Sequence, residues 1–306
     1  MATTKSKEHN SKMRLVAGLS VAVLALSVAA PLFRLAEPTH PLAAAAFRLL
    51  VAFVCLTPFL SGAIRRQETD RRFWSLGLMA GVFYALHFGL WVTSLTLTSV
   101  AASVTLVTAT PVLLALWAIL SNRDRPTRRT WLALILCAVG MAIIGGHDMG
   151  LSADHLLGDA LALGGAAAMA GYLLVARRLG RDLNILAFMT VATGSGAVVL
   201  YGACLATGVD PRPASTEALV FLLLAALIPQ LIGHNLLTWA LRHTTPTNVG
   251  IATVGEPVGA TILAWLWLGE VVGWTTATGC AVVLTGVILA ITERRGVPGA
   301  NGGSKA

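Results

Sequence analysis

Long apolar stretches recur along almost the whole chain and limit how it can fold more than any other feature. A helix needs about 20 mostly apolar residues to cross the hydrocarbon core of a bilayer, and in lipid it must satisfy its own backbone hydrogen bonds. The stretches of this length are 14–36, 41–62, 74–95, 98–120, 130–147, 156–176, 184–206, 216–240, 246–268 and 272–292. We therefore predict an all-α integral membrane protein with ten transmembrane helices and no soluble domain.

The composition is that of a membrane protein. Charged residues make up 12% of the 306 residues and hydrophobic residues 56%, whereas about a quarter of a soluble domain is charged. The first apolar stretch follows a basic N-terminus, as a secretory signal does, but nine further stretches favour a first helix that is retained. The four cysteines show no metal-ligand spacing, so we expect neither a metal nor another cofactor.

Lys and Arg residues set the expected orientation. If the N-terminus lies inside, nineteen of the 22 Lys and Arg residues fall on the cytoplasmic side, and only Arg34 and Arg212 fall outside. This asymmetry is a strong positive-inside signal. We therefore expect a multi-pass protein of the inner (plasma) membrane with cytoplasmic tails at 1–13 and 293–306. The formal charge of +8 then reflects topology and requires no nucleic-acid partner.

The two halves of the sequence repeat each other with a shift of 146 residues. We divide the chain accordingly into five-helix halves at 14–147 and 154–292. Because each half has an odd number of helices, the second half must enter the membrane from the opposite side. Inverted repeats of this kind are typical of secondary transporters, whose solute site lies between the halves near the midplane. The pairs aligned by the shift are Pro111 with Pro257, Asp124 with Glu270, and Gly140 with Gly286.

The repeated segments resemble a known family. "ALRHTTPTNVGIATVGEPVGATILAWLWLGE" followed by "GCAVVLTGVILA", and the earlier "SLTLTSVAASVTLVTATPVLLALWAILSNRD" followed by "CAVGMAIIG", are similar to EamA domains. The likeness extends over 14–292 and rests on the order and spacing of the segments. It implies the ten-helix branch of the drug/metabolite transporter superfamily, whose members are mostly inner-membrane permeases, many of them exporters of amino acids or other small metabolites.

This sequence departs from the family pattern at two kinds of position. The family often has a Trp in the first helix of each half, where this chain has Ser27 and Met169. These replacements weaken the expectation of a cavity for flat aromatic solutes. The family also often has Glu where the first half has Asp124, a change that keeps the acid.

Two histidines lie deep in equivalent helices. The shift places His87 one residue from His234, and inversion puts the first toward the outside and the second toward the inside. Tyr84 and Trp91 share a helical face with His87, and Gln230 and Thr238 share a face with His234. These side chains are either hydrogen-bonding groups that line a solute cavity or structural links between helices.

An acid and a proline stand together in the middle of the ninth predicted span. Pro257 cannot donate a backbone hydrogen bond and disturbs the turn before it, and Pro111 marks the equivalent point in the fourth span. We predict a hinge or kink at both prolines. Glu256 is expected either to bind the ammonium of a solute or a coupling proton, or to pair within the bundle with Asn248 or a histidine.

Arg48 lies about seven residues into the second predicted span. Its long side chain can snorkel to the outer headgroups, and this structural role is the one that the sequence favours. The alternative is that Arg48 binds a solute carboxylate. The equivalent place in the seventh span, near Thr193, carries no charge.

The predicted function is transport of a small polar organic solute, an amino acid or related metabolite, by alternating access. Export and proton coupling are the favoured versions, and a G-x-x-x-x-G-K-[ST] phosphate loop is absent from the sequence. The partners expected are the solute and the lipid bilayer, while monomer and homodimer both remain open. The alternatives are a non-transporting scaffold or channel and a membrane enzyme, whose acids would come from the outer loop. The candidate metal ligands of that loop are His147, Asp148, Asp154, His155 and Asp159.

Overall fold

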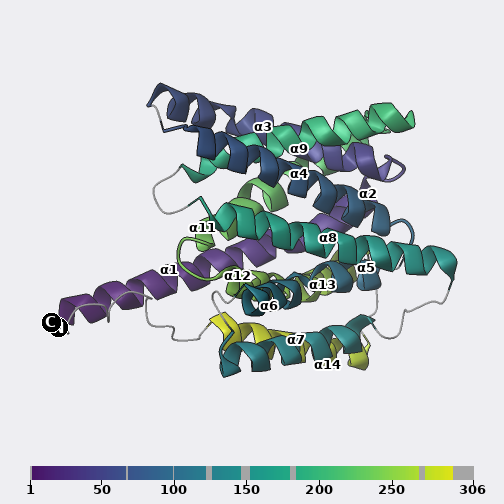
Figure 1. The fold of residues 1–306 in the computed structure, drawn as a ribbon. Helices are drawn as coiled ribbons and strands as arrows, with labels where there is room; N and C mark the ends of the chain where they lie inside the picture. Colours follow the sequence, from purple (N-terminus) through teal and green to yellow (C-terminus); the bar gives the residue numbers. More distant parts are fainter. Residues whose placement is uncertain are drawn as a thin grey trace.

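The computed structural model describes residues 2–66, 68–98, 100–121, 126–145, 152–179, 184–268 and 273–291. Every regular element in this part of the chain is a helix (Figure 1). The helices are α1 (Ala2–Ser27), α2 (Ala29–Leu35), α3 (Pro41–Arg65), α4 (Arg71–Ser94), α5 (Val100–Val107), α6 (Thr110–Leu120), α7 (Arg128–Gly145), α8 (Ala153–Arg177), α9 (Ile185–Thr207), α10 (Thr216–Ala225), η1 (Ala226–His234), α11 (Asn235–Ala240), α12 (Pro246–Thr253), α13 (Glu256–Leu268) and α14 (Trp274–Ile291). Asp124, His147, Asp148 and Glu270 lie outside the described residues.

Seven helical stretches of the described residues are long and apolar enough to cross a membrane. They are Met13–Leu35, Pro41–Arg65, Arg71–Ser94, Ala153–Arg177, Ile185–Thr207, Thr216–Ala240 and Pro246–Trp267. Thr110–Leu120 and Ala277–Leu289 are apolar but shorter. The seven long stretches coincide with seven of the ten predicted spans. The fold is therefore that of a helical multi-pass membrane protein.

Polar residues start the long helices in the way that helix capping requires. The Asp70 carboxylate accepts a hydrogen bond from the Phe73 N–H at 2.6 Å, and the Asn184 Oδ1 accepts one from the Ala187 N–H at 3.2 Å. Each cap satisfies one of the backbone N–H groups that the first turn of a helix leaves without a partner. The caps therefore fix where α4 and α9 begin.

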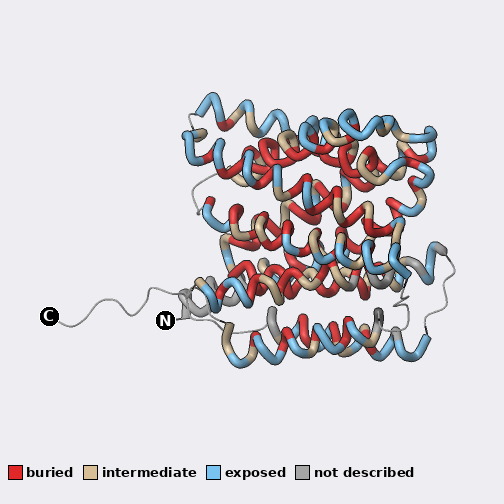
Figure 2. Tube along the Cα trace, turned by 45° about the vertical axis from the view of Figure 1, so that its right-hand side comes forward, coloured by how far each residue is buried: buried red, intermediate tan, exposed pale blue. Residues whose placement is uncertain are grey.

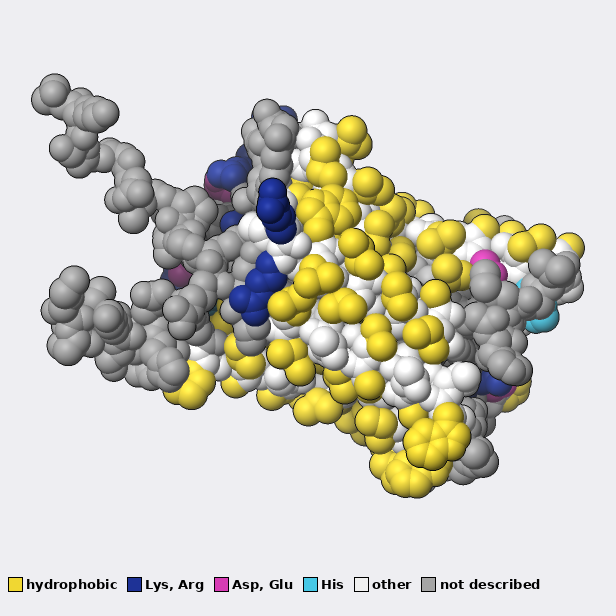
Figure 3. Space-filling view, turned by 90° about the horizontal axis from the view of Figure 1, so that it is seen from below, with side chains coloured by type: hydrophobic (Ala, Val, Ile, Leu, Met, Phe, Trp, Pro, Cys, Tyr) yellow, Lys and Arg dark blue, Asp and Glu magenta, His cyan; other side chains and the backbone are white. Residues whose placement is uncertain are grey.

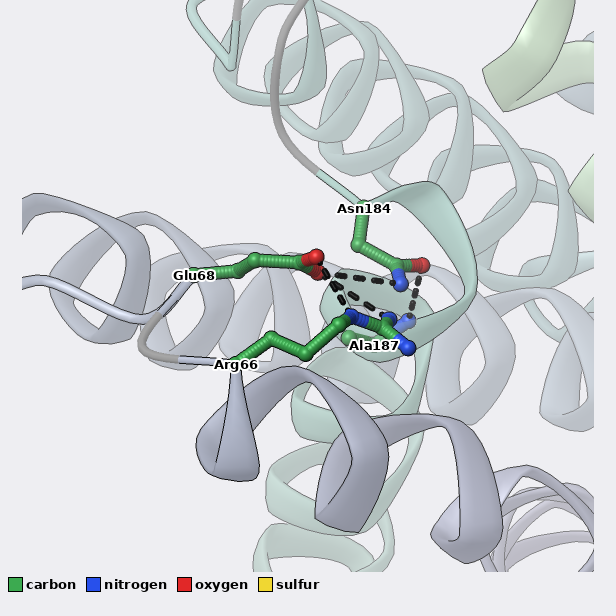
Figure 4. Close-up of polar contacts among 4 residues, drawn as sticks. All are labelled: Arg66, Glu68, Asn184 and Ala187. Carbon is green, nitrogen blue, oxygen red and sulfur yellow. Dashed lines mark hydrogen bonds and ion pairs between the residues drawn. The ribbon is translucent and has the colours of Figure 1, made fainter.

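A small polar cluster joins the end of α3 and the residues that follow it to the start of α9 (Figure 4). The Arg66 Nε donates to Glu68 at 2.6 Å, and the Asn184 amide donates to the same carboxylate at 3.4 Å. The hydrogen bond from Arg66 holds the pKa of Glu68 below its ordinary value. A carboxyl group whose pKa is lower in the folded protein than in the unfolded chain contributes stability when the pH is above its unfolded pKa. The contact with Glu68 therefore contributes at neutral pH, and its contribution is lost as the pH falls through the lowered pKa.

Two of the predicted spans are interrupted at equivalent positions. The fourth breaks between α5 and α6 at residues 108–109, and the ninth breaks between α12 and α13 at residues 254–255. These positions differ by the same 146 residues that relate the two halves of the sequence. Each break precedes a Thr-Pro or Glu-Pro pair, where the proline has no N–H for the preceding turn.

The helices pack in layers (Figure 1). α3 lies against α9, α4 lies against both α8 and α9, and α7 lies against α14. Buried positions concentrate on the helix faces that look into the bundle, while the outer faces carry exposed positions (Figure 2). α7 and α14 have a separate small core with α12 and α13, which includes Ala133, Cys137 and Val283.

The α7–α14 contact is reciprocal. A Cβ on Gly140 would lie 2.8 Å from the backbone oxygen of Gly279, and a Cβ on Gly286 would lie 2.9 Å from that of Ala133. Gly140 and Gly286 are equivalent under the 146-residue shift, and so are Ala133 and Gly279. Both glycines are therefore needed for the same close approach, made once from each helix.

The outer surface is apolar over the middle of the bundle. Seen from below, hydrophobic side chains cover the central region and Lys and Arg side chains gather toward one end (Figure 3). Large exposed hydrophobic residues include Leu24, Leu120, Val198 and Leu205 at 67%, 83%, 73% and 75%. A surface of this kind faces lipid rather than water.

Candidate functional site

A cavity lies in the middle of the bundle, beside both helix breaks. Its wall takes side chains from both halves of the sequence. Of the predicted site residues, His87, Trp91, His234 and Glu256 line the cavity. The other lining residues are Leu26, Ala29, Arg48, Phe88, Val107, Thr108, Thr110, Met169, Leu173, Leu237 and Thr253.

Arg48 is the most unexpected group in the cavity wall. The prediction that it snorkels to the headgroups is wrong, because the residue is 0% exposed. Its Nε donates to the Gln230 Oε1 at 3.1 Å, and its guanidinium carbon lies 4.3 Å from the centre of the Phe88 ring. The side chain thus turns inward, toward the centre of the bundle rather than along the helix to its end.

The neighbours of Arg48 on α3 explain the inward direction. Ala44, Ala45 and Ala52 lie on the same face of the helix, at three or four residues from Arg48, and all are buried. Small side chains let neighbouring helices approach closely. This face of α3 consequently packs against protein, and an arginine placed on it has no path to the lipid headgroups.

The two predicted histidines meet across the cavity. The ring centres of His87 and His234 are 6.4 Å apart, and the His87 ring lies nearly parallel to Trp91 with centroids 6.1 Å apart. The His87 Nδ1–H donates to the backbone oxygen of Gly165 at 2.9 Å. Because a carbonyl oxygen can only accept, this bond fixes the proton on Nδ1 when the ring is neutral.

His234 has a different environment. Its ring packs against Tyr84 and Phe88 with centroids 5.6 and 5.3 Å away, and its buried Nδ1 has no hydrogen-bond partner among the described residues. The two histidines are therefore not symmetrical in their hydrogen bonds, although they occupy equivalent helices. His87 is fixed by the backbone of α8, whereas His234 keeps an unpaired nitrogen.

Tyr84 and Gln230 lie directly behind the cavity wall. Tyr84 stacks on Tyr172 with ring centres 4.0 Å apart, and the Tyr172 hydroxyl lies 2.5 Å from the Thr238 hydroxyl. Gln230 accepts the hydrogen bond from Arg48. Neither residue is among those that line the cavity, but both contact side chains that do, Tyr84 at His234 and Gln230 at Arg48.

The helix segment that carries Gln230 and His234 is a π-helix. η1 spans Ala226–His234 and includes Pro229. Proline removes an N–H and disfavours a regular α-turn, and wide π-turns often occur at functional sites. From its apolar composition this span is predicted to be an ordinary helix, and Pro229 in its middle is the residue that signals the departure.

Glu256 is the first residue of α13, immediately after the break. Its side chain lines the cavity and is only partly exposed. On the other side of the break, the Thr253 hydroxyl donates to the Gly250 oxygen at 2.6 Å, which satisfies a carbonyl near the interruption. In the first half the Thr110 hydroxyl, which lies after the break, donates across it to the Val107 oxygen at 3.0 Å.

Asn248, like Tyr84 and Gln230, is not among the residues that line the cavity. Its side-chain amide donates to the Thr244 hydroxyl at 3.1 Å, at the start of α12. It therefore does not pair with Glu256. Pro111 and Pro257 lie in the first turns of α6 and α13, next to the two breaks.

The acids of the predicted outer loop form no metal site in the part of the chain that the structure describes. The Asp159 carboxylate accepts a hydrogen bond from the Thr98 hydroxyl at 2.9 Å, and the His155 ring lies 2.9 Å from the Ser152 hydroxyl. Both residues are thus engaged at the start of α8.

The cavity wall carries two ionisable groups of opposite type. Among the described residues that line it, Arg48 is the only Lys or Arg and Glu256 the only Asp or Glu. The ion pairs of the described residues join Arg34 to Glu37 and Arg66 to Glu68, so no ion pair within 4.0 Å joins Arg48 to Glu256. The cavity wall therefore combines histidine and aromatic rings with a guanidinium and a carboxyl group that form no ion pair with each other.

Comparisons with known proteins agree with this description. The sequence model of the EamA-like transporter family matches residues 14–146 and 156–292. Two relatives from Bacillus subtilis (strain 168) are the uncharacterized transporter YwfM, 24% identical with 83% of this chain and 85% of the relative covered, and the uncharacterized transporter YdfC, 24% identical with 79% of each covered.

A solved crystal structure has the same fold. It superimposes with a TM-score of 0.71 at 15% sequence identity, over 91% of this chain and 97% of the other. At this identity the likeness concerns the fold alone. The family match extends over both halves of the sequence and most of their length. The chain therefore belongs to the EamA-like transporter family of the drug/metabolite transporter superfamily.

Proposed function

We propose that the chain is a secondary transporter that exports a small polar organic solute, an amino acid or related metabolite, by alternating access. One observation carries the proposal: a single central cavity takes Arg48 and His87 from the first half and His234 and Glu256 from the second. A site built from both halves is where a transporter with internal repeats binds its solute.

The arrangement proposed is ten spans in two inverted halves, 14–147 and 154–292, with both termini cytoplasmic in the inner membrane. Three features support it. The helix breaks fall at equivalent residues, the α7–α14 contact is reciprocal, and the packing of α4 on α8 is matched by that of η1 and α11 on α1. Related halves of this kind can exchange conformations, which gives inward-open and outward-open states of similar energy.

Pro111 and Pro257 are proposed as the hinges of this exchange. Each follows a break in the backbone hydrogen-bond ladder, and each break borders the cavity through Thr108, Thr110, Thr253 or Glu256. A change of angle between α5 and α6, or between α12 and α13, would move cavity side chains without unfolding a helix.

Glu256 is proposed as the coupling or solute-binding acid. A carboxylate deep in the bilayer is costly unless it serves a cavity or a partner, and no ion pair fixes it to Arg48. It can receive a proton that moves down the gradient, or it can bind the ammonium group of an amino acid. The two roles make different predictions for a variant that cannot ionise.

The test is counterflow and uptake of a labelled amino-acid and metabolite panel in proteoliposomes, with and without a pH gradient. We expect Glu256→Gln to lose gradient-driven transport by at least about tenfold, which is a barrier change of about 1.4 kcal/mol. Counterflow that survives in the variant identifies a coupling group, and counterflow that is also lost identifies a solute-binding group. Transport that is unchanged in both assays would remove Glu256 from the mechanism, and a folded parent that moves no solute would reject the transporter proposal.

A further inference from the structure

Arg48 is the largest fully buried side chain of the described residues. A buried guanidinium is costly unless its donors find acceptors. Within the described residues it has one hydrogen bond, from Nε to Gln230, and both terminal nitrogens have no partner. Two donors of a fixed cation are thus left without acceptors at the wall of the central cavity.

The contacts of Arg48 hold the guanidinium in one position. Gln230 fixes the Nε edge, and the Phe88 ring lies 4.3 Å from the guanidinium carbon, a distance typical of a cation–π contact. The Phe33 ring lies 5.7 Å away. Because the edge and a face are occupied by protein, the two buried terminal nitrogens are the part of the group that has no partner among the described residues.

We propose that Arg48 is the anchor for a carboxylate group of the transported solute, with Gln230 as its positioning residue. Two neighbouring N–H donors in one plane match the two oxygens of a carboxylate in a bidentate contact. This inference rests on the proposed function, since it assumes that the solute occupies the cavity. It narrows the small polar solutes of the proposed function to those that carry a carboxylate, and it excludes amines and neutral polar molecules.

The charge of the cavity favours a carboxylate over a phosphate. Arg48 is the only Lys or Arg among the described residues that line it, and Glu256 lines the same space. A doubly charged phosphate would face this acid without a second permanent cation. A solute with one negative and one positive group leaves the cavity neutral, with its carboxylate at Arg48 and its ammonium toward Glu256.

The second half of the protein argues against a purely structural role for this arginine. The position equivalent to Arg48 in α9 lies near Thr193, whose hydroxyl donates to the Met189 oxygen of its own helix at 2.8 Å. The corresponding helix thus packs in the bundle without a cation. The positive charge is specific to α3, at the helix face that borders the cavity.

The test measures binding apart from transport. Purified protein in detergent is unfolded thermally with glycine, alanine, leucine and phenylalanine, each compared with its decarboxylated amine, its amide and its phosphonate analogue. We expect at least one amino acid to raise the unfolding midpoint while its amine and amide do not.

Arg48→Gln should remove this shift, and Arg48→Lys should reduce it, since an ammonium cannot make the planar two-point contact. The control is Arg65→Gln, an exposed arginine on the same helix, which should keep the full shift.

Several outcomes would overturn the anchor. These are an equal shift with the amide or amine, a shift that persists in Arg48→Gln, a larger shift with the phosphonate, or no shift with any amino acid. If Arg48→Gln does not fold, the reduced shift expected of Arg48→Lys decides the question. The two proposals can fail separately. If the protein binds carboxylic acids through Arg48 but transports no solute, Arg48 is a carboxylate anchor and the transporter proposal is rejected.

Discussion

Gln230 accepts the one hydrogen bond that the Arg48 side chain donates to the described residues, and this acceptor can be changed with almost no change of shape. Gln230→Glu keeps the size of the side chain but places a carboxylate beside the guanidinium. We expect the new acid to compete with a solute carboxylate and to weaken amino-acid binding by at least about tenfold, or 1.4 kcal/mol. Thermal-shift titration checks this, and a structural role alone predicts an unchanged affinity because the Glu retains the contact.

The unpaired charge of Arg48 should also limit stability. Replacing even a buried ion pair with apolar residues of similar volume is often neutral or stabilising by about 1–4 kcal/mol, and a buried charge without an ion-pair partner costs more. We expect Arg48→Met to unfold at a higher temperature than the parent when no solute is added, while it loses the response to amino acids. A lower unfolding midpoint would mean that the Arg48–Gln230 bond contributes more to the fold than the charge costs.

For individual residues, some cavity-lining side chains could be predicted from the sequence and others could not. His87, His234 and Glu256 were found because inversion and depth single out polar residues in the middle of apolar spans, and all three line the cavity. The direction of Arg48 was missed because a long side chain near a span end has two possible destinations. Its buried Ala neighbours, Ala44 and Ala52, are the feature that decides between them.

Gly140 and Gly286 set the distance between two whole helices. A Cβ on Gly140 would lie 2.6 Å from a methyl carbon of Val283, and one on Gly286 would lie 2.8 Å from the Cys137 sulfur, so neither site has room for a side chain. We expect Gly140→Ala and Gly286→Ala each to destabilise the protein by about 1–3 kcal/mol, the usual cost of overpacking.

Thermal unfolding in detergent measures this effect. The matched control is Gly202→Ala in α9, where a Cβ meets nothing within 4 Å, so the change should be neutral or slightly stabilising. Because the two interface glycines make the same contact from opposite helices, their losses should be similar. A large loss at one site and none at the other would contradict the reciprocal geometry.

Helix interruptions were predictable to different degrees. Pro111 and Pro257 indicated a disturbed turn from sequence alone, and the breaks lie within a few residues of them. Apolar periodicity did not reveal that the eighth span is divided into α10, η1 and α11, because a π-turn changes the hydrogen-bond partners of the backbone and leaves the composition apolar. Only Pro229 marks that segment.

The whole molecule combines a scaffold that repeats with a site that does not. Helix breaks, glycine contacts and helix neighbours recur in both halves, whereas Arg48 and Glu256 each occur once, on different halves. In the proposed mechanism the repeated features would give two related conformations, and unlike groups in the cavity would bind a solute with two unlike ends in one orientation. The composition predicted a helical membrane protein, whereas the meeting of Arg48 and Glu256 in one cavity required the structure.

Inversion itself makes a prediction about which side of the membrane each loop faces. Arg71 and Glu217 are exposed residues in the first turns of α4 and α10, and they differ by 146 residues. In a chain without its native cysteines, we expect Glu217→Cys to react with a membrane-impermeant thiol reagent in intact cells. Arg71→Cys should react only after the membrane is permeabilised, because positive-inside topology places it in the cytoplasm. If both positions react from the same side, the halves are not inverted, and the symmetry argument for alternating access is lost even though the cavity remains.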